Sequence, residues 1–158
     1  MGALLLMLAG CDPYAGTWIL LLEVTKAPDE EDVGLDGTGA VELYPLADGR
    51  YSTDGGLGVV LTGTIEANEL DLAYTLKNTT TSPSCDENST LLDYQMSGTV
   101  SEDAGLDGTL TVTQEWKRQG CGGDFSDTTS YVYSVAGVQV EANDDAHISS
   151  SDSFGFNP

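Results

Sequence analysis

Basic residues are scarce in this sequence: five Lys plus Arg stand against 26 Asp plus Glu, for a formal net charge of −21. Proteins bind nucleic acid by neutralising phosphates with Lys and Arg side chains, and anionic membrane surfaces repel a strongly acidic chain. We therefore expect no nucleic-acid partner. The acidic residues are spread from Asp12 to Asp152, and such a surplus indicates solubility or a salty habitat rather than a binding site.

Histidine is nearly absent as well, since His147, near the carboxyl end, is the single copy. A Ser/His/Asp or Cys/His nucleophile needs a histidine as general base. The sequence has neither a Gly-x-Ser-x-Gly elbow nor a phosphate-binding glycine loop. Carboxylate pairs are plentiful, but a glycosidase needs two at a defined separation in a cleft. We expect that the protein is not an enzyme and uses no cofactor.

The chain also lacks an apolar run long enough to cross a bilayer as a helix. Its longest run, ALLLMLA at residues 3–9, is far shorter than the ~20 residues that a transmembrane helix needs. Its length is typical of the hydrophobic region of a signal peptide. The sequence therefore indicates an exported protein.

The residues after this run, Leu8-Ala9-Gly10-Cys11, resemble the lipobox of bacterial lipoproteins at every position. In that family a lipid is attached to the cysteine sulfur, and the chain is cut just before that cysteine. The resemblance implies a signal peptide over residues 1–10, lipidation of Cys11 and a lipid-anchored place in the cell envelope, on the periplasmic or outer face of a bacterial membrane. The basic residues that usually precede the apolar run are missing. The alternative, a buried cysteine in a first strand, conflicts with Asp12 and Pro13, which would interrupt that strand.

Cysteine is otherwise rare. If Cys11 carries a lipid, only Cys85 and Cys121 remain, and an even pair in an exported domain predicts a disulfide. Both lie in Gly-, Ser- and Asp-rich segments that are typical of loops. No Cys-x-x-Cys pair is present, so zinc has no support and we expect no metal site.

Acidic turns leave calcium as an alternative. Residues 31–43 and 102–114 match at eight of thirteen positions, and their carboxylates are ligands that calcium prefers. EF-hand loops beginning at Asp32 and Asp103 would, however, have Leu43 and Gln114 where a glutamate is required. Solvated turns explain these acids equally well. The alternative function is a calcium-stabilised or adhesin-like interaction module of the envelope.

Alternation of apolar and polar residues runs through the body of the chain and predicts strands. The clearest case is ELDLAYTLKN, at residues 69–78. Further strands are expected at residues 17–26, 41–46, 50–53, 58–66, 92–100, 106–117 and 129–140. No stretch keeps a 3.6-residue period. We predict an all-β fold, an antiparallel up-and-down eight-stranded barrel or barrel-like sandwich over residues 11–140, followed by an acidic, Ser-rich tail at 141–158. Alternate loops of such a meander lie at one end, so the Cys85 and Cys121 loops can meet.

Gly16 and Trp18, in the stretch AGTW, resemble the Gly-x-Trp that opens the first strand of lipocalins. That family's eight-stranded barrel takes a small apolar ligand at its open end. An arginine that packs on this tryptophan has no clear equivalent here, and an ordinary core role also explains Trp18. The resemblance implies a lipocalin-like barrel. Its candidate ligand-binding residues are Trp18, Leu72, Tyr94, Trp116 and Tyr133.

These patterns together predict a lipid-anchored envelope protein with a β-barrel binding or structural module. A hollow barrel would favour carriage of a small apolar ligand, and a barrel filled by its own side chains would favour a structural or docking role. The expected partners are the membrane, through the anchor, and either an apolar ligand or an envelope protein.

Overall fold

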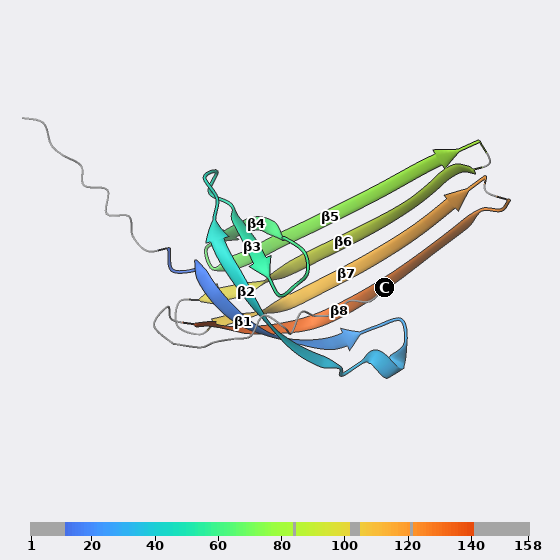
Figure 1. Cartoon of the computed structure of the whole chain (residues 1–158). Coiled ribbons are helices and arrows are strands. Elements are labelled where there is room, and N and C mark those ends of the chain that lie inside the picture. The colour runs from blue at the N-terminus through green and yellow to red at the C-terminus, as the bar shows by residue number, and fades with distance from the viewer. Residues whose placement is uncertain (1–11, 84, 102–104, 121, 141–158) are drawn as a thin grey trace, which may run out of the picture.

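A computed structural model describes residues 12–83, 85–101, 105–120 and 122–140. Eight antiparallel strands form a closed barrel, in which each strand pairs with the next along the chain and the last pairs with the first (Figure 1). The strands are β1 (Gly16–Lys26), β2 (Asp36–Pro45), β3 (Tyr51–Gly55), β4 (Thr62–Glu66), β5 (Glu69–Ser82), β6 (Cys85–Ser101), β7 (Gly105–Gln119) and β8 (Phe125–Val140). The predicted all-β, up-and-down, eight-stranded barrel is confirmed.

Helix is almost absent from the described residues, as the lack of a 3.6-residue period predicted. A single 3-10 turn, η1 (Glu30–Asp32), lies in the connection between β1 and β2. Its three residues are all acidic and none is buried. The turn therefore belongs to the solvated end of a hairpin and takes no part in the core.

Strand limits differ from the prediction at several places. β4 begins at Thr62 rather than at residue 58. Leu61, just before it, makes two hydrogen bonds with Thr53. The Thr53 backbone N–H donates to the Leu61 carbonyl at 2.9 Å, and the Leu61 backbone N–H donates to the Thr53 hydroxyl at 2.9 Å. β5 and β6 meet in a tight hairpin, so Cys85 is the first residue of a strand and not part of a loop. The predicted limits of β5 and β6 lie where the apolar residues of each strand end. The Thr- and Ser-rich segments continue because each pairs with its neighbour.

The barrel interior is filled by its own side chains. The cluster of sixteen buried residues comprises Trp18, Leu20, Leu22, Val41, Leu43, Leu57, Leu61, Leu70, Leu72, Tyr94, Met96, Val100, Leu106, Leu110, Val112 and Val135. Leu61, Val100 and Leu110 are 0% exposed. A hollow barrel would leave its inward side chains open to the space inside, so this interior is a packed core.

Glycine allows β6 and β7 to approach closely where the sheet wraps around that core. Gly98 lies opposite Gly108 in the ladder. A Cβ at Gly98 would collide with the backbone of Asp107 and Gly108, and one at Gly108 would collide with the backbone of Ser97. Any larger residue at either position would push the strands apart.

The amino-terminal end of the barrel is closed by the segment before β1. Trp18 donates its indole N–H to the carbonyl of Tyr14 at 3.0 Å, and the Tyr14 hydroxyl donates to Asn68 at 2.6 Å. The Tyr51 hydroxyl donates to the Asp12 carboxylate at 2.7 Å, and the rings of Tyr14 and Tyr51 pack edge to face. Asp12 is thus already part of the folded barrel.

Candidate functional site

The strands of the second half are much longer than those of the first, and they extend beyond the barrel (Figure 1). β4 pairs with β5 as far as Ala73, and β1 pairs with β8 as far as Val132. Beyond those points, residues 74–82, 85–94, 112–119 and 125–131 form a four-stranded sheet. Its outer strands have no further pairing partner among the described residues. We call this part the arm.

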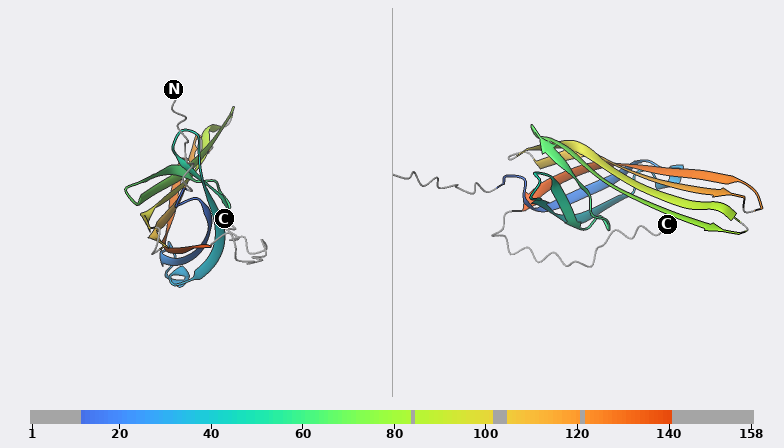
Figure 2. Two further views of the ribbon diagram at one scale, coloured as in Figure 1. Left: turned by 90° about the vertical axis from the view of Figure 1, so that its left-hand side faces the viewer. Right: turned by 90° about the horizontal axis from the view of Figure 1, so that it is seen from above.

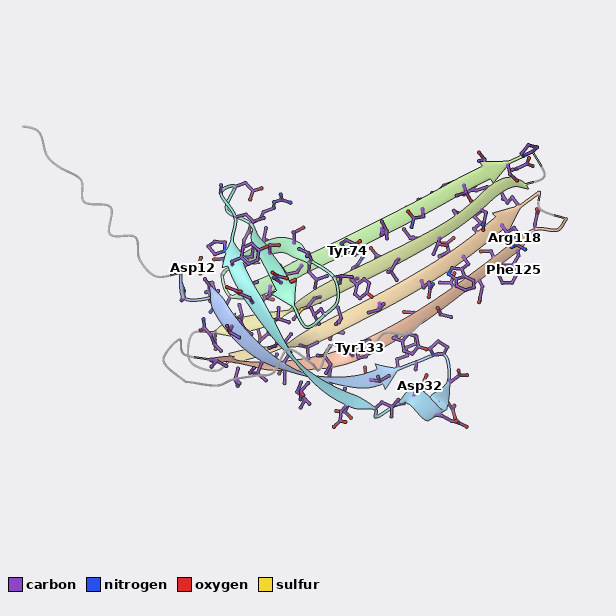
Figure 3. All side chains as sticks on the ribbon, in the orientation of Figure 1. Asp12, Asp32, Tyr74, Arg118, Phe125 and Tyr133 are labelled. Carbon is purple, nitrogen blue, oxygen red and sulfur yellow. The ribbon has the colours of Figure 1, made fainter. Side chains whose placement is uncertain are left out.

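The arm and the amino-terminal segment lie at opposite ends of the molecule. Asp12 is at one end in Figure 3, and Arg118 and Phe125 mark the tip of the arm at the other. The view from above in Figure 2 shows the same separation. A partner at the arm tip would therefore be far from the amino-terminal segment of the barrel.

The ladder register places four residues abreast in each row of the arm. The face that continues the barrel interior, which we call the arm face, has four rows from the barrel to the tip. They are Tyr74, Tyr94, Val112 and Tyr131, then Leu76, Leu92, Gln114 and Thr129, then Asn78, Thr90, Trp116 and Asp127, and finally Thr80, Asn88, Arg118 and Phe125.

The opposite face of the arm is polar. Its rows are Thr75, Asp93, Thr113 and Ser130, then Lys77, Leu91, Glu115 and Thr128, and then Thr79, Ser89, Lys117 and Ser126. Leu91 is the one apolar residue in these rows. The arm is thus an amphipathic sheet, the kind of element that buries its apolar face against a second layer.

Exposure of the arm face rises steadily with distance from the barrel. On β5, Leu72 is 1% exposed and Leu76 is 41% exposed. Trp116 and Phe125, in the two rows nearest the tip, are 51% and 53% exposed. A contiguous patch of large apolar side chains that is open to water is typical of an interaction site.

Tyrosines gather where the arm joins the barrel. Tyr74 and Tyr94 pack edge to face with ring centroids 6.2 Å apart, and Tyr131 stacks on Tyr133 at 6.4 Å. Burial raises the pKa of Tyr133 to about 12, and Tyr131, Tyr94 and Asp32 add to this shift. Burial and the neighbouring Tyr74 likewise raise the pKa of Tyr94. The phenols of Tyr94 and Tyr133 therefore stay neutral to a higher pH than a free tyrosine does.

Four of the five candidate ligand-binding residues are brought together in or against the barrel core, and the fifth lies apart. Trp18, Leu72 and Tyr94 lie in the packed core, and Tyr133 packs against that core while half-buried. Trp116 lies outside the barrel on the arm face. The alternation of apolar and polar residues predicted that Trp116 lies on the inward face of its strand. It could not predict that the barrel ends before the row in which Trp116 lies.

Phe125 is the residue of the arm face that sequence reasoning missed. It lies in a Gly-, Ser- and Asp-rich segment that is typical of a loop, and it is the first residue of β8. The next residues on the same face of β8, Asp127 and Thr129, are polar, so no apolar period marks the start of this strand. Only the pairing with Arg118 shows which face it occupies.

Several predicted features fall on residues outside the described part of the chain. Cys11, Cys121, His147, the signal segment and the tail are among them, so lipidation and the disulfide stay predictions. Within the described residues, no three His, Cys, Asp or Glu side chains are grouped so as to hold a metal ion. No helix in that same part has the length and apolar character needed to cross a membrane.

Comparison with protein-family models, with curated proteins and with solved structures finds no match to the chain.

Proposed function

We propose that this is a lipid-anchored protein of the bacterial cell envelope whose filled barrel supports the arm as a docking surface. The observation that carries the proposal is the contrast between a packed barrel interior and an uncovered arm face. Carriage of a small apolar ligand inside the barrel has less support, because the inward residues already fill that space.

The anchor fits the position of the amino terminus. Asp12 directly follows Cys11 and accepts hydrogen bonds from the Tyr51 hydroxyl and from the backbone N–H of Tyr14, the latter at 3.0 Å. A lipid on Cys11 would therefore join a rigid barrel with almost no linker. The arm would then point away from the membrane (Figure 3).

The register of β6 and β7 supports the predicted disulfide. Glu87 lies opposite Gln119, the last residue of β7, so the start of β6, where Cys85 lies, and the end of β7, two residues before Cys121 in the sequence, are paired at the arm tip. Such a bond would tie β6 and β7 together at the arm tip and would form in an oxidising compartment.

Membrane fractionation tests the anchor. We expect the unaltered chain to be cleaved before Cys11 and to partition into the detergent phase, whereas Cys11→Ser stays uncleaved and loses its lipid. Cys85→Ser serves as the matched control, since it removes a cysteine without removing the anchor. Equal partitioning of the unaltered chain and Cys11→Ser would refute lipidation.

Analysis of bound small molecules tests docking against carriage. We expect organic extracts of the purified protein to hold no apolar molecule in a one-to-one ratio. A stoichiometric molecule that persists in both Trp116→Ser and Phe125→Ser would lie away from the arm face. It would show that the protein is a carrier.

A further inference from the structure

We propose that the arm face docks on the arm face of a second copy of this chain. This inference rests on the proposed docking role of the arm and names its partner. The first row of the arm face is covered by the barrel, since Tyr94 and Val112 are buried in its core. Beyond that row the arm is one half of a β-sandwich, because its apolar face has no second layer among the described residues. A second copy would supply the missing layer.

The size of the arm face suits a reversible dimer. Strands with a rise of about 3.3 Å per residue and a spacing of about 4.8 Å give the uncovered part of the face, from Leu76 to Ser82 across four strands, an area on the order of 450 Å². Two such faces would bury at most roughly 900 Å², an area typical of weak and transient interfaces rather than of stable ones. We therefore expect dissociation constants between about 1 and 100 µM.

The composition of the arm face matches an interface. Trp, Tyr and Arg contribute most to protein interfaces, whereas Lys and Glu are depleted from them. The arm face contains Trp116, Tyr131 and Arg118 and has no Lys or Glu in any of its rows. Trp116, Arg118 and Phe125 are neighbours on β7 and β8, so the proposed contact is centred on these two strands.

The charges of the arm face complement those of an identical face. Its two charged residues are Arg118 and Asp127, so its net charge is zero although the chain carries −21. Neither side chain has a hydrogen bond or ion pair with another described residue. If β7 of each copy lies over β8 of the other, Arg118 of each copy meets Asp127 of the second copy.

That arrangement keeps the two barrels at the same end of the dimer, as two anchors in one membrane require. Sheets packed face to face cross at about 30°. Because β1–β4 of each copy stand on the side of the sheet that the arm face continues, the contact is confined to the rows near the arm tip. Of the five basic residues, Lys77, Lys117 and Arg118 lie in the arm, so the arm is also where repulsion between copies is weakest.

Sedimentation velocity of the full chain in mild detergent, over a range of concentrations, tests the proposal. We expect a monomer–dimer equilibrium that Trp116→Ser and Phe125→Ser each weaken by about tenfold or more. Val138→Ser and Leu21→Ser are the matched controls, because these apolar residues are 60% and 47% exposed on the outside of the barrel. Both control variants leave the amino-terminal segment unchanged, so they retain any association that this segment causes.

A charge exchange identifies the partner as a second copy. Arg118→Asp leaves two acidic groups on each face, and Asp127→Arg leaves two basic groups, so each single variant should repel its own copy. The double variant restores neutrality and should dimerise again. Failure of the double variant to dimerise, with an unchanged circular dichroism spectrum, would overturn the proposal.

Other outcomes assign the arm face to a different occupant. The proposal that a second copy covers the arm face is wrong if the chain stays monomeric at every concentration. It is also wrong if a dimer forms that Trp116→Ser and Phe125→Ser leave unchanged. Dimerisation that appears only in Phe154→Ser or Phe156→Ser would assign the face to the carboxyl-terminal segment. If the unaltered chain is monomeric but Trp116 is shielded in envelope preparations, the docking role stands and only the second copy fails.

Discussion

The two ends of β5 differ although their sequence pattern is the same. Leu70 and Leu72 lie within the barrel and are 3% and 1% exposed, whereas Leu76, on the same face of the same strand, is 41% exposed. Alternation is identical at the three positions. What differs is the opposing layer, which β1–β4 provide inside the barrel and which the chain itself does not provide along the described arm.

This difference shows what an apolar period does and does not specify. A period of two sets which face of a strand is apolar, but burial depends on what lies opposite that face. In the barrel the opposing strands come from the same chain. The arm has the same chemistry without that cover, and this is the physical basis for assigning it a partner.

Replacing core and arm leucines should give the largest contrast. Leu72→Ala removes a fully buried side chain, and we expect it to lower the free energy of unfolding by about 2–5 kcal/mol. Leu76→Ala changes the same residue type on the same face, and we expect a loss of less than about 1 kcal/mol at concentrations where the chain is monomeric. Urea denaturation of both variants measures the difference. Equal losses would show that the arm face is covered within one chain.

The closed end of the barrel should show an intermediate effect. Asp12→Ala leaves the Tyr51 hydroxyl and the Tyr14 amide without their acceptor, so we expect a loss of about 1–3 kcal/mol. Asp12→Asn retains an acceptor oxygen and is the matched control. Denaturation of the barrel should show this loss of stability. The dissociation constant of the dimer of folded chains should stay unchanged. A change in dimerisation would mean that the two ends are coupled.

Alkaline pH should destabilise the barrel through two of its tyrosines. Burial, helped by the bond to Asp12, raises the pKa of Tyr51 from 10.0 to about 12, and the pKa of Tyr133 also rises to about 12. Between pH 10 and about pH 12, the unfolded chain loses the phenolic protons of Tyr51 and Tyr133, whereas the folded chain keeps them. Stability is therefore fully present below pH 10 and falls as pH rises toward 12.

Thermal melting from pH 9 to pH 11.5 measures this dependence. Tyr51→Phe and Tyr133→Phe should each flatten the decline, since neither variant can ionise at that position. Tyr44→Phe, at an exposed position on β2, is the matched control and should retain it. A slope that is unchanged in Tyr51→Phe and Tyr133→Phe would contradict this account.

Sequence reasoning predicted the fold class, the strand number and the meander because each strand in the barrel carries a clear alternation, as β5 does from Leu70 to Tyr74. It did not predict the arm. The segments Thr79–Thr80 and Ser126–Thr128 have no apolar period, and they form strands because their backbones pair with neighbouring strands. Trp116 shows the same limit for the site, since its face could be predicted but its exposure depends on where β1 and β4 end.

Quenching of single tryptophans by acrylamide tests the contrast between barrel and arm most directly. Trp116→Phe leaves Trp18, which is 2% exposed, and Trp18→Phe leaves Trp116, which is 51% exposed. We predict that Trp18 is shielded at every protein concentration, whereas Trp116 is quenched in dilute solution and becomes shielded as the chain dimerises. An accessible Trp18 would contradict the filled barrel, and a Trp116 that is shielded at the lowest concentration would contradict the open arm.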